Sequence, residues 1–447
     1  MSPTKESNLT AKEKLRPISG FPELLPEQRI VELQWIDKIR GIFESYGFTS
    51  IEPRSVEPLE VLLKQGDTDK EIYTLGRLLD APNLDSEPTY GLHYDMTVPM
   101  ARYVAANLSQ LVFPFKRYQI QKAWRGERPQ DGRFREFLQC DIDVVDTREI
   151  PLHFDVEIPT IMHQAINAIQ AGPISTKINN RKILEGYYSG LGVHNTATAI
   201  RIIDKIDKIG VNGVTDLLSK ELALNFKTID KIIQLAQIRG SGHEVATQVQ
   251  ALGVTSELLE HGLSELTFVM QELQKVDREA FSVDLSIARG LAYYTGTVYE
   301  TRFLEYPDFP SICGGGRYDD LVGDFVNKRL PGIGISIGLS RIFAKLIKEN
   351  RIQANKKSPT EILVIHSKGA PYEVVNKTAQ TLRRRGFNVE QYHEDRKLNA
   401  QLKYAEGKGI PWIWFPPNEA EGEHQVKNSV SRIQELADPT TWTPEKG

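Results

Sequence analysis

Cysteine is nearly missing from this sequence, which has only Cys140 and Cys313. Two cysteines exclude a scaffold held together by disulfides and a thiolate-rich zinc site. No stretch approaches the roughly 18 consecutive apolar residues that a membrane-spanning helix needs, and the polar start of the chain lacks the apolar core of a signal peptide. These absences predict a cytoplasmic protein with no membrane contact.

A strong charge imbalance is missing as well. The 447 residues include 55 Lys and Arg against 59 Asp and Glu, which gives a formal net charge of −4. This balance excludes a uniformly basic nucleic-acid-binding protein but is compatible with a local basic patch. The length corresponds to two to four domains of about 100–200 residues each.

Hydrophobic periodicity divides the chain into four segments, which are residues 1–172, 173–281, 282–347 and 360–447. The first begins with an amphipathic helix that starts at Pro26 and is ended by Gly47, followed by a short strand that ends at Pro53. The second contains short amphipathic helices, typical of a small helical domain. The third returns to strand patterns, and the fourth alternates between strands and helices, as in an α/β module with a mostly parallel sheet.

Two strand patterns, at 111–124 and 134–146, flank the polar turn RGERPQDGR and predict a β-hairpin. Basic residues are concentrated here: Lys116, Arg117, Lys122, Arg125, Arg128, Arg133 and Arg135. Lysine and arginine also protect exposed sheet edges. Arginine, however, binds phosphate oxygens through a bidentate fork, so the cluster favours phosphate binding.

Side chains alternate between the two faces of a strand, so the second strand of this hairpin should have two different faces. One face carries Phe137, Gln139, Asp141 and Asp143, and the other carries Leu138, Cys140, Ile142 and Val144. The apolar face is expected to contact the core. The polar face could bind an ammonium group or could simply face water.

Two glycine-rich stretches resemble phosphate-binding loops only superficially. CGGGRYDDLV lacks the GK[ST] ending of a P-loop, and PGIGISIGLSR lacks the context of a dinucleotide-binding fingerprint. The second stretch instead predicts a strand of small residues that a ligand or another segment can approach closely, with Arg341 just beyond it. The stretch LHYDMTVPMAR predicts a loop before a helix with Thr97 at the N-cap, and none of the nine histidines has metal-ligand spacing.

Taken together, these stretches resemble the class II aminoacyl-tRNA synthetases and, within that class, the histidyl-tRNA synthetases. The helix and strand ending at Pro53, the hairpin FKRYQIQKAWRGERPQDGRFREFLQCDIDV and the stretch PGIGISIGLSRI resemble the three class motifs in their order. ARGLAYYTGTVYE and SICGGGRYDDLV resemble the two histidine-specific segments. The resemblance extends from about Arg16 to the end of the sequence.

The resemblance implies an α+β fold. An antiparallel-sheet catalytic core would be formed by 1–172 and 282–347, with a helical insertion domain at 173–281 and an α/β anticodon-binding domain at 360–447. The implied reaction is the ATP-dependent ligation of L-histidine to its cognate tRNA through a histidyl-adenylate, with release of pyrophosphate and AMP. ATP would be a substrate, Mg²⁺ a cofactor, the tRNA for histidine a partner, and the enzyme a homodimer.

The same resemblance implies roles for individual residues. Arg125 and Arg289 would be catalytic, beside the α-phosphate. The ATP-binding residues would be Arg125, Glu127, Arg133, Phe137 and Arg341, with Glu127 also a metal ligand. The histidine-binding residues would be Asp95, Thr97, Gln139, Asp143, Arg289, Tyr293, Tyr294 and Tyr318.

Two rival interpretations use the same fold. A catalytically inactive relative acts as the regulatory subunit of ATP phosphoribosyltransferase and senses histidine, but such relatives lose the ATP-binding arginines and usually the C-terminal module. Another class II synthetase, for proline, threonine or glycine, would lack the adjacent tyrosines and the GGGRYD stretch. Both rivals predict a different outcome in amino-acid-dependent pyrophosphate exchange.

Overall fold

The computed structural model describes residues 15–63, 71–77, 89–288, 294–321, 325, 329–354, 356–366, 369–418 and 422–444. The chain forms two compact units: unit 1 contains residues 1–22 and 36–349, and unit 2 contains residues 23–35 and 350–447. Among the described residues, no helix is both long and apolar enough to cross a membrane.

Helix α2 (Pro26–Ser45) is the helix that the sequence predicts from Pro26, and the division between the two units falls within it. Ile39 and Phe43 are fully buried, as their helical spacing requires. Gly47 ends the helix with a φ of 78°, a conformation that glycine adopts without a steric penalty. The strand after it is shorter than expected, because only Thr49–Ser50 (β1) pair with β5.

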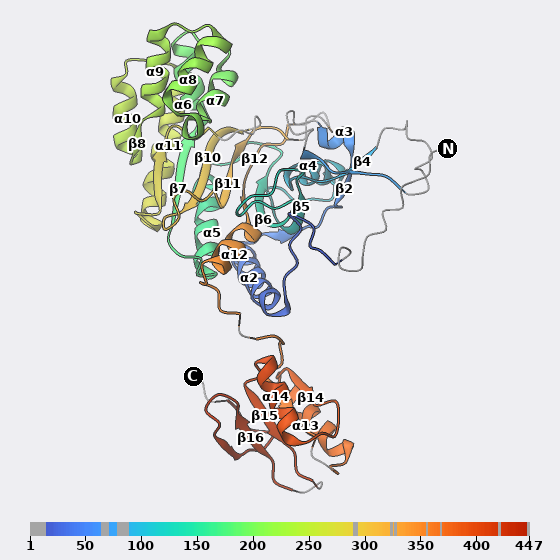
Figure 1. The fold of residues 1–447 in the computed structure, drawn as a ribbon. Coiled ribbons are helices and arrows are strands. Elements are labelled where there is room, and N and C mark those ends of the chain that lie inside the picture. Colours follow the sequence, from blue (N-terminus) through green and yellow to red (C-terminus); the bar gives the residue numbers. More distant parts are fainter. Residues whose placement is uncertain are drawn as a thin grey trace. The chain divides into compact units, whose positions relative to one another are not determined.

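A nine-stranded sheet forms the centre of unit 1 (Figure 1). Its strand order is β1-β5-β6-β12-β11-β10-β7-β9-β8, antiparallel from β5 to β7 and parallel at the pairs β1–β5 and β7–β9. This sheet confirms the predicted antiparallel core. The strands beyond β1 are β5 Phe115–Trp124, β6 Glu136–Val145, β7 Ile174–Asn180, β8 Arg239–Gly240, β9 Phe281–Asp284, β10 Tyr294–Phe303, β11 Cys313–Tyr318 and β12 Gly332–Ile337.

Helices cover both faces of this sheet. Helices α5 (Phe154–Ala168) and α12 (Leu339–Lys348) pack against strands β12 and β6. On the face that α5 covers, Tyr299 of β10 donates a 2.7 Å hydrogen bond to the carbonyl oxygen of Asp155. Helix α4 (Thr97–Ala106) contributes to a cluster that includes Phe115 and Tyr318, so it borders the opposite, polar face.

A helical segment lies at the end of the sheet formed by β7, β9 and β8 (Figure 1). Its helices are α6 Arg181–Gly190, α7 Thr196–Ile203, α8 Ile206–Leu222, α9 Phe226–Ala236, α10 Gly242–Ala251 and α11 Glu257–Val276. Asparagine side chains cap several of them; for example, Asn195 accepts from the backbone N–H of Thr198 at 3.0 Å. Strands β7 and β9 belong to the large sheet, so the helices span 181–276, a shorter stretch than the expected 173–281.

Unit 1 also contains a small three-stranded sheet of order β2-β4-β3. It consists of β2 Val56–Pro58, β4 Tyr90–Leu92 and β3 Thr74–Leu75. The short helix α3 Leu59–Leu62 follows β2 directly. Glu57 of β2 is fully buried and is paired with two arginines: Arg102 Nε lies 2.6 Å from its Oε1, and Arg54 Nη2 lies 2.7 Å from its Oε2. The pair with Arg102 holds the small sheet against α4.

Unit 2 has an α/β core around a five-stranded sheet of order β14-β13-β15-β16-β17. The first three strands are parallel and the last two are antiparallel, so the predicted mostly parallel sheet holds for three of the five. The strands are β13 Ile362–Val364, β14 Val389–Gln391, β15 Trp412–Phe415, β16 Gln425–Asn428 and β17 Gln434–Leu436, and the helices are α13 Tyr372–Arg384 and α14 Leu398–Lys408. Trp414 is fully buried in its core.

Candidate functional site

The candidate site lies on one face of the large sheet, which we call the polar face. The β5–β6 hairpin pairs Arg117 with Asp143, Gln119 with Asp141 and Gln121 with Gln139. Directly opposite residues in antiparallel strands point to the same side, so these polar side chains form one layer. Strand β12 continues the layer, because Ser336 pairs with Asp141 and Gly334 with Asp143.

Asp143 is the best-held side chain of the polar face. Its Oδ2 lies 2.5 Å from Nη2 of the fully buried Arg117, and its Oδ1 accepts a 3.0 Å hydrogen bond from the Tyr318 hydroxyl. Burial raises the pKa of Asp143 to about 6, although Arg117 and Tyr318 both act to lower it. Sequence analysis counted Arg117 only as one of seven basic residues, and its pairing with Asp143 depends on the cross-strand register.

Glycines make room for these side chains, as the small-residue strand predicted. A Cβ on Gly334 would lie 2.0 Å from Asp143 Oδ1, and one on Gly332 would lie 2.4 Å from the Tyr318 ring. A Cβ on Gly316 would lie 2.8 Å from the ring of Tyr294. The three consecutive glycines of the sequence lie in strand β11. There Gly316 leaves room for the Tyr294 ring, and Gly315 leaves room for the backbone of β12.

Asp141 has one oxygen, Oδ1, to which no described residue donates a hydrogen bond. Ser336 donates a hydrogen bond to the carboxylate and itself accepts one from Gln139 Nε2 at 2.6 Å. Within the described part of the chain, neither Asp141 Oδ1 nor Gln139 Oε1 has a hydrogen-bond partner. Burial raises the pKa of Asp141 to about 7, and the charges of Asp143 and Asp95 add to this effect while Arg117 opposes it.

Asp95 borders the same layer at the beginning of α4. Its Oδ1 accepts a 3.1 Å hydrogen bond from the backbone N–H of Val98, so it supplies the capping interaction that sequence analysis gave to Thr97. Thr97 is instead the first residue of the helix. Burial raises the pKa of Asp95 even though Arg125 lies close enough to lower it.

The arginine-rich turn lies at the end of the hairpin. Arg125 Nε donates to the carbonyl oxygen of Tyr94 at 3.0 Å, and its guanidinium lies 5.1 Å from the centre of the Phe137 ring. Arg133 Nε lies 2.7 Å from Oε2 of Glu127. Contacts within the protein therefore hold both guanidinium groups, and those of Arg125 come from outside the turn.

Arg341 reaches the same turn from α12. Its Nε donates to the carbonyl oxygen of Gly132 at 2.8 Å, and its Nη1 donates to that of Ser311. The backbone N–H of Leu138 donates to Ser340 Oγ at 2.8 Å, which fixes the start of α12 beside β6. Arg341, which is far from the hairpin in the sequence, is thus fixed against the turn that follows Arg125.

Glu71 is a member of this region that sequence analysis missed. Burial raises the pKa of Glu71, and its hydrogen-bonded neighbour Glu127 raises it further, whereas Arg125 and Arg133 lower it. The backbone N–H of Gly126 donates to the Glu71 carbonyl oxygen at 2.7 Å. Glu71 lies in a stretch with no motif, so only the folded chain reveals its position. Two adjacent carboxylates are a suitable partial ligand set for a hard divalent cation.

The remaining candidates are placed as follows. Tyr294 is buried in β10 and pairs with Tyr318 of β11. Arg289 and Tyr293 lie outside the described residues. Among the described residues, no group of three His, Cys, Asp or Glu side chains could hold a metal ion.

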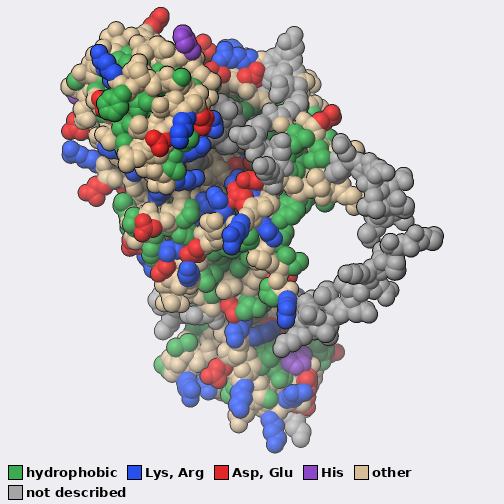
Figure 2. Space-filling model, turned by 45° about the horizontal axis from the view of Figure 1, so that its top comes forward, with side chains coloured by type: hydrophobic (Ala, Val, Ile, Leu, Met, Phe, Trp, Pro, Cys, Tyr) green, Lys and Arg blue, Asp and Glu red, His purple; other side chains and the backbone are tan. Residues whose placement is uncertain are grey.

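Figure 2 shows Lys and Arg side chains gathered around a hollow between the helical segment and the rest of unit 1.

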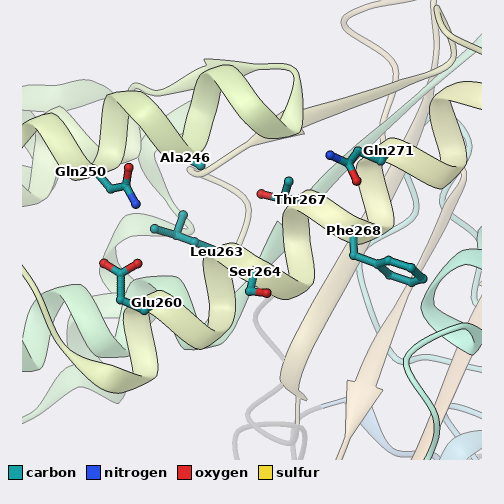
Figure 3. A pocket seen from close by; sticks show the side chains of 8 residues that line it. All are labelled: Ala246, Gln250, Glu260, Leu263, Ser264, Thr267, Phe268 and Gln271. Carbon is teal, nitrogen blue, oxygen red and sulfur yellow. The ribbon is translucent and has the colours of Figure 1, made fainter.

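A groove also lies on the helical segment, between α10 and α11 (Figure 3). Its volume is about 400 Å³, and Ala246, Gln250, Glu260, Leu263, Ser264, Thr267, Phe268 and Gln271 line it. Its one charged lining residue, Glu260, is an acid, so the groove does not suit a phosphorylated ligand. The polar face and the arginine-rich turn remain the candidate site.

Comparisons with known proteins identify the family of the chain. A histidyl-tRNA synthetase family profile matches residues 20–342, and an anticodon binding domain profile matches residues 361–432. The chain is 50% identical over 426 residues to the histidine–tRNA ligase of Thermobifida fusca (strain YX), covering 95% of this chain and 97% of that protein.

Solved structures show the same relationship. The histidyl-tRNA synthetase of Nostoc sp. PCC 7120 superposes with a TM-score of 0.83 at 37% identity, covering 95% of this chain and 96% of that one. An ATP phosphoribosyltransferase regulatory subunit/histidyl-tRNA synthetase from Bacillus halodurans C has a TM-score of 0.72 at 19% identity, covers 87% of this chain and 96% of that one, and shows a shared fold only. From the profile match and the full-length similarity, the chain belongs to the histidyl-tRNA synthetase family.

Proposed function

We propose that this chain is a histidine–tRNA ligase, which activates L-histidine with ATP and transfers it to its cognate tRNA. The observation that carries the proposal is the meeting of two different subsites on one hairpin. One is a buried acid–tyrosine pair, Asp143 and Tyr318, and the other is a turn around which Arg125 and Arg341 gather. The first suits the imidazole of histidine, and the second suits a triphosphate.

The reaction needs no nucleophilic side chain. In the first step, a carboxylate oxygen of histidine attacks the α-phosphorus of ATP in line, and pyrophosphate leaves with the electrons of the broken P–O bond. In the second, a ribose hydroxyl of the terminal tRNA adenosine attacks the carbonyl carbon of the adenylate, and AMP leaves. The protein must hold the reactants in line and stabilise charge that develops on the phosphate oxygens.

For the ATP side, the resemblance and the geometry support the same assignment. Arg125 would contact the α-phosphate, and Phe137, which it already stacks on, would support the adenine together with Arg341. Arg341 would also bind the γ-phosphate, and Arg133 would help to place the nucleotide. Arg289, beside the α-phosphate and the histidine carboxylate, would be the second catalytic arginine.

For the amino-acid side, Asp143 and Tyr294 would bind the imidazole nitrogens, with Tyr293 and Tyr318 close by. Tyr318 already donates to Asp143, which orients the carboxylate. A site that hydrogen-bonds both nitrogens rejects isosteres that lack them, because its buried polar groups would be left without partners. The α-ammonium group would be held by Asp95, Thr97 and Gln139.

Magnesium would be held by Glu127 with Glu71 beside it. Their adjacent carboxylates fit a cation that proteins usually bind through one or two carboxylates and the substrate phosphates. When bound, the ion would supply charge neutralisation for the leaving pyrophosphate. The ion pair between Arg133 and Glu127 would hold both side chains in place beside the nucleotide.

The macromolecular partner would be the tRNA for histidine. The module at 360–447, which contains the match to an anticodon binding domain, would contact the anticodon, and the helical segment would contact the acceptor end.

We further propose a homodimer in the cytoplasm. Size-exclusion chromatography with light scattering would give twice the 50.6 kDa chain mass for the dimer.

The test of function is histidine-dependent exchange of pyrophosphate into ATP. The wild type should catalyse exchange with histidine and with no other amino acid. Exchange with proline, threonine or glycine would indicate another class II synthetase, and exchange with none would indicate a histidine-sensing regulator. Either outcome would refute the proposal.

The role of Arg289 is tested in the same assay. Arg289→Ala should lower exchange by at least about 10²–10³-fold, as does the loss of one electrostatic contact to a transition state. Histidine binding, measured by calorimetry, should change far less. Arg278→Ala, at an exposed position, is the matched control. Near-normal exchange in Arg289→Ala would contradict the assignment.

A further inference from the structure

The polar face carries an uneven set of charges. Three carboxylates, those of Asp95, Asp141 and Asp143, influence one another electrostatically and are therefore close together. Arg117 is paired with Asp143, and Arg125 is the arginine that lowers the pKa of Asp95. Within the described residues, the guanidinium that acts on Asp141 is that of Arg117, and it is already paired with Asp143, so the Asp141 carboxylate is left in excess.

Asp141 is also built to accept one more hydrogen bond. Its side chain is only 5% exposed, and Ser336 is its hydrogen-bond donor. Its Oδ1 has no partner in the described residues, and Oε1 of neighbouring Gln139 has none either. A buried acceptor without a donor costs about 1–3 kcal/mol, and more when it is charged. A buried acceptor of this kind calls for a donor that the described chain does not supply, and a bound ligand is one such donor.

We infer that Asp141 is a further specificity-determining residue, whose free Oδ1 accepts a hydrogen bond from the α-ammonium group of the bound amino acid. This inference rests on the proposed function. The sequence resemblance assigned the ammonium to Asp95, Thr97 and Gln139. The structure adds a second buried carboxylate, which supplies the negative charge that balances the ammonium in a site with little water.

The ammonium group suits this position better than the imidazole. An ammonium has three N–H donors and one positive charge. Oxygens of Asp95, Gln139 and Asp141 offer three acceptors and an excess of negative charge. A neutral imidazole N–H would leave that excess charge uncompensated, and the Asp143–Tyr318 pair already provides an acceptor for it.

The test separates the two ends of histidine with two ligands. Histidinol keeps the ammonium and the imidazole, whereas imidazolepropionate keeps the imidazole but lacks the ammonium. Calorimetric Kd values are measured at pH 8 for the wild type and for Asp141→Asn, which preserves side-chain size. The variant should bind histidinol about 10–100-fold more weakly, the value of a hydrogen bond to a charged group. Its affinity for imidazolepropionate should be unchanged or higher.

Each other outcome overturns the inference. An equal loss for both ligands would show that Asp141 acts on the imidazole or on the fold, and no loss for either would show that it is not a ligand. Asp141→Ser, which is smaller, should give the same pattern and replaces the Asn variant if that one does not fold. Asp216→Asn, at an exposed site on α8, is the matched control.

The proposed function can fail separately from this inference. If wild-type protein binds neither histidinol nor histidine and shows no exchange, the histidine ligase itself is refuted. If wild-type exchange with histidine is normal and only the ligand pattern of Asp141→Asn is wrong, the inference about Asp141 alone is refuted.

Discussion

Replacing Asp141 by Asn should stabilise the free protein, although it weakens binding. The ordinary pKa of this carboxyl is 3.8, and burial raises it to about 7. A folded-state pKa above the unfolded value means that the ionised group destabilises the fold, fully above pH 7 and not at all below about pH 4. A tenfold change in acidity corresponds to about 1.4 kcal/mol, so the cost reaches about 4 kcal/mol at high pH.

The pH dependence gives this prediction its sharpest form. From pH 5 to pH 8 the cost in the wild type grows by about 2–3 kcal/mol, and Asn removes that change because it does not titrate. Each kcal/mol moves the midpoint of a 150–250-residue domain by about 2–4 °C, and less in a larger unit. Scanning calorimetry measures the unfolding midpoint of Asp141→Asn minus that of the wild type. This difference should be a few degrees larger at pH 8 than at pH 5.

The control for this experiment is Asp216→Asn, which removes an exposed carboxylate from α8. Its unfolding midpoint should change between pH 5 and pH 8 by the same amount as that of the wild type. A midpoint difference between Asp141→Asn and wild type that is the same at pH 5 and pH 8 would refute the reasoning. So would a wild type that becomes the more stable protein at pH 8. Either result would mean that the Asp141 carboxylate is not held in a low-dielectric, under-compensated site.

Two further substitutions probe the same layer. Gly334→Ala should raise the KM for histidine in pyrophosphate exchange by at least about tenfold while changing the KM for ATP little, because its Cβ would lie 2.0 Å from Asp143 Oδ1. Gly407→Ala, where a Cβ meets nothing, is the control, and an unaltered KM for histidine would count against the close approach. Arg117→Met should lower the free energy of unfolding by about 3–5 kcal/mol, since it leaves Asp143 buried and unpaired. Adding Asp143→Asn should recover most of that loss in urea unfolding; no recovery would disprove the pairing as its cause.

Local patterns in the sequence predicted the hairpin and its two faces, because side-chain alternation follows directly from strand geometry. The full burial of Cys140, Ile142 and Val144 agrees with the predicted apolar face. The close approach at Gly334 was predicted for a similar reason, since a strand of small residues leaves space that another group fills.

Features that depend on contacts between distant segments could not be predicted in this way. The pairing of Arg117 with Asp143 follows from the register of the hairpin, which the length and shape of the turn determine. Glu71 reaches Glu127 through tertiary structure alone. The predicted helical domain began at residue 173, but residues Ile174–Asn180 form strand β7 of the large sheet, because β10 and β9 pair with it on either side.

Strand β6 runs through both proposed subsites, the one for the nucleotide and the one for the amino acid. Phe137, beside the arginine-rich turn, and Asp143, deep in the sheet, are six residues apart on the same face. At about 3.3 Å per residue they are separated by roughly 20 Å, and every position between them on that face is polar. One continuous strand therefore fixes the spacing between the proposed nucleotide and amino-acid subsites, with no hinge between them.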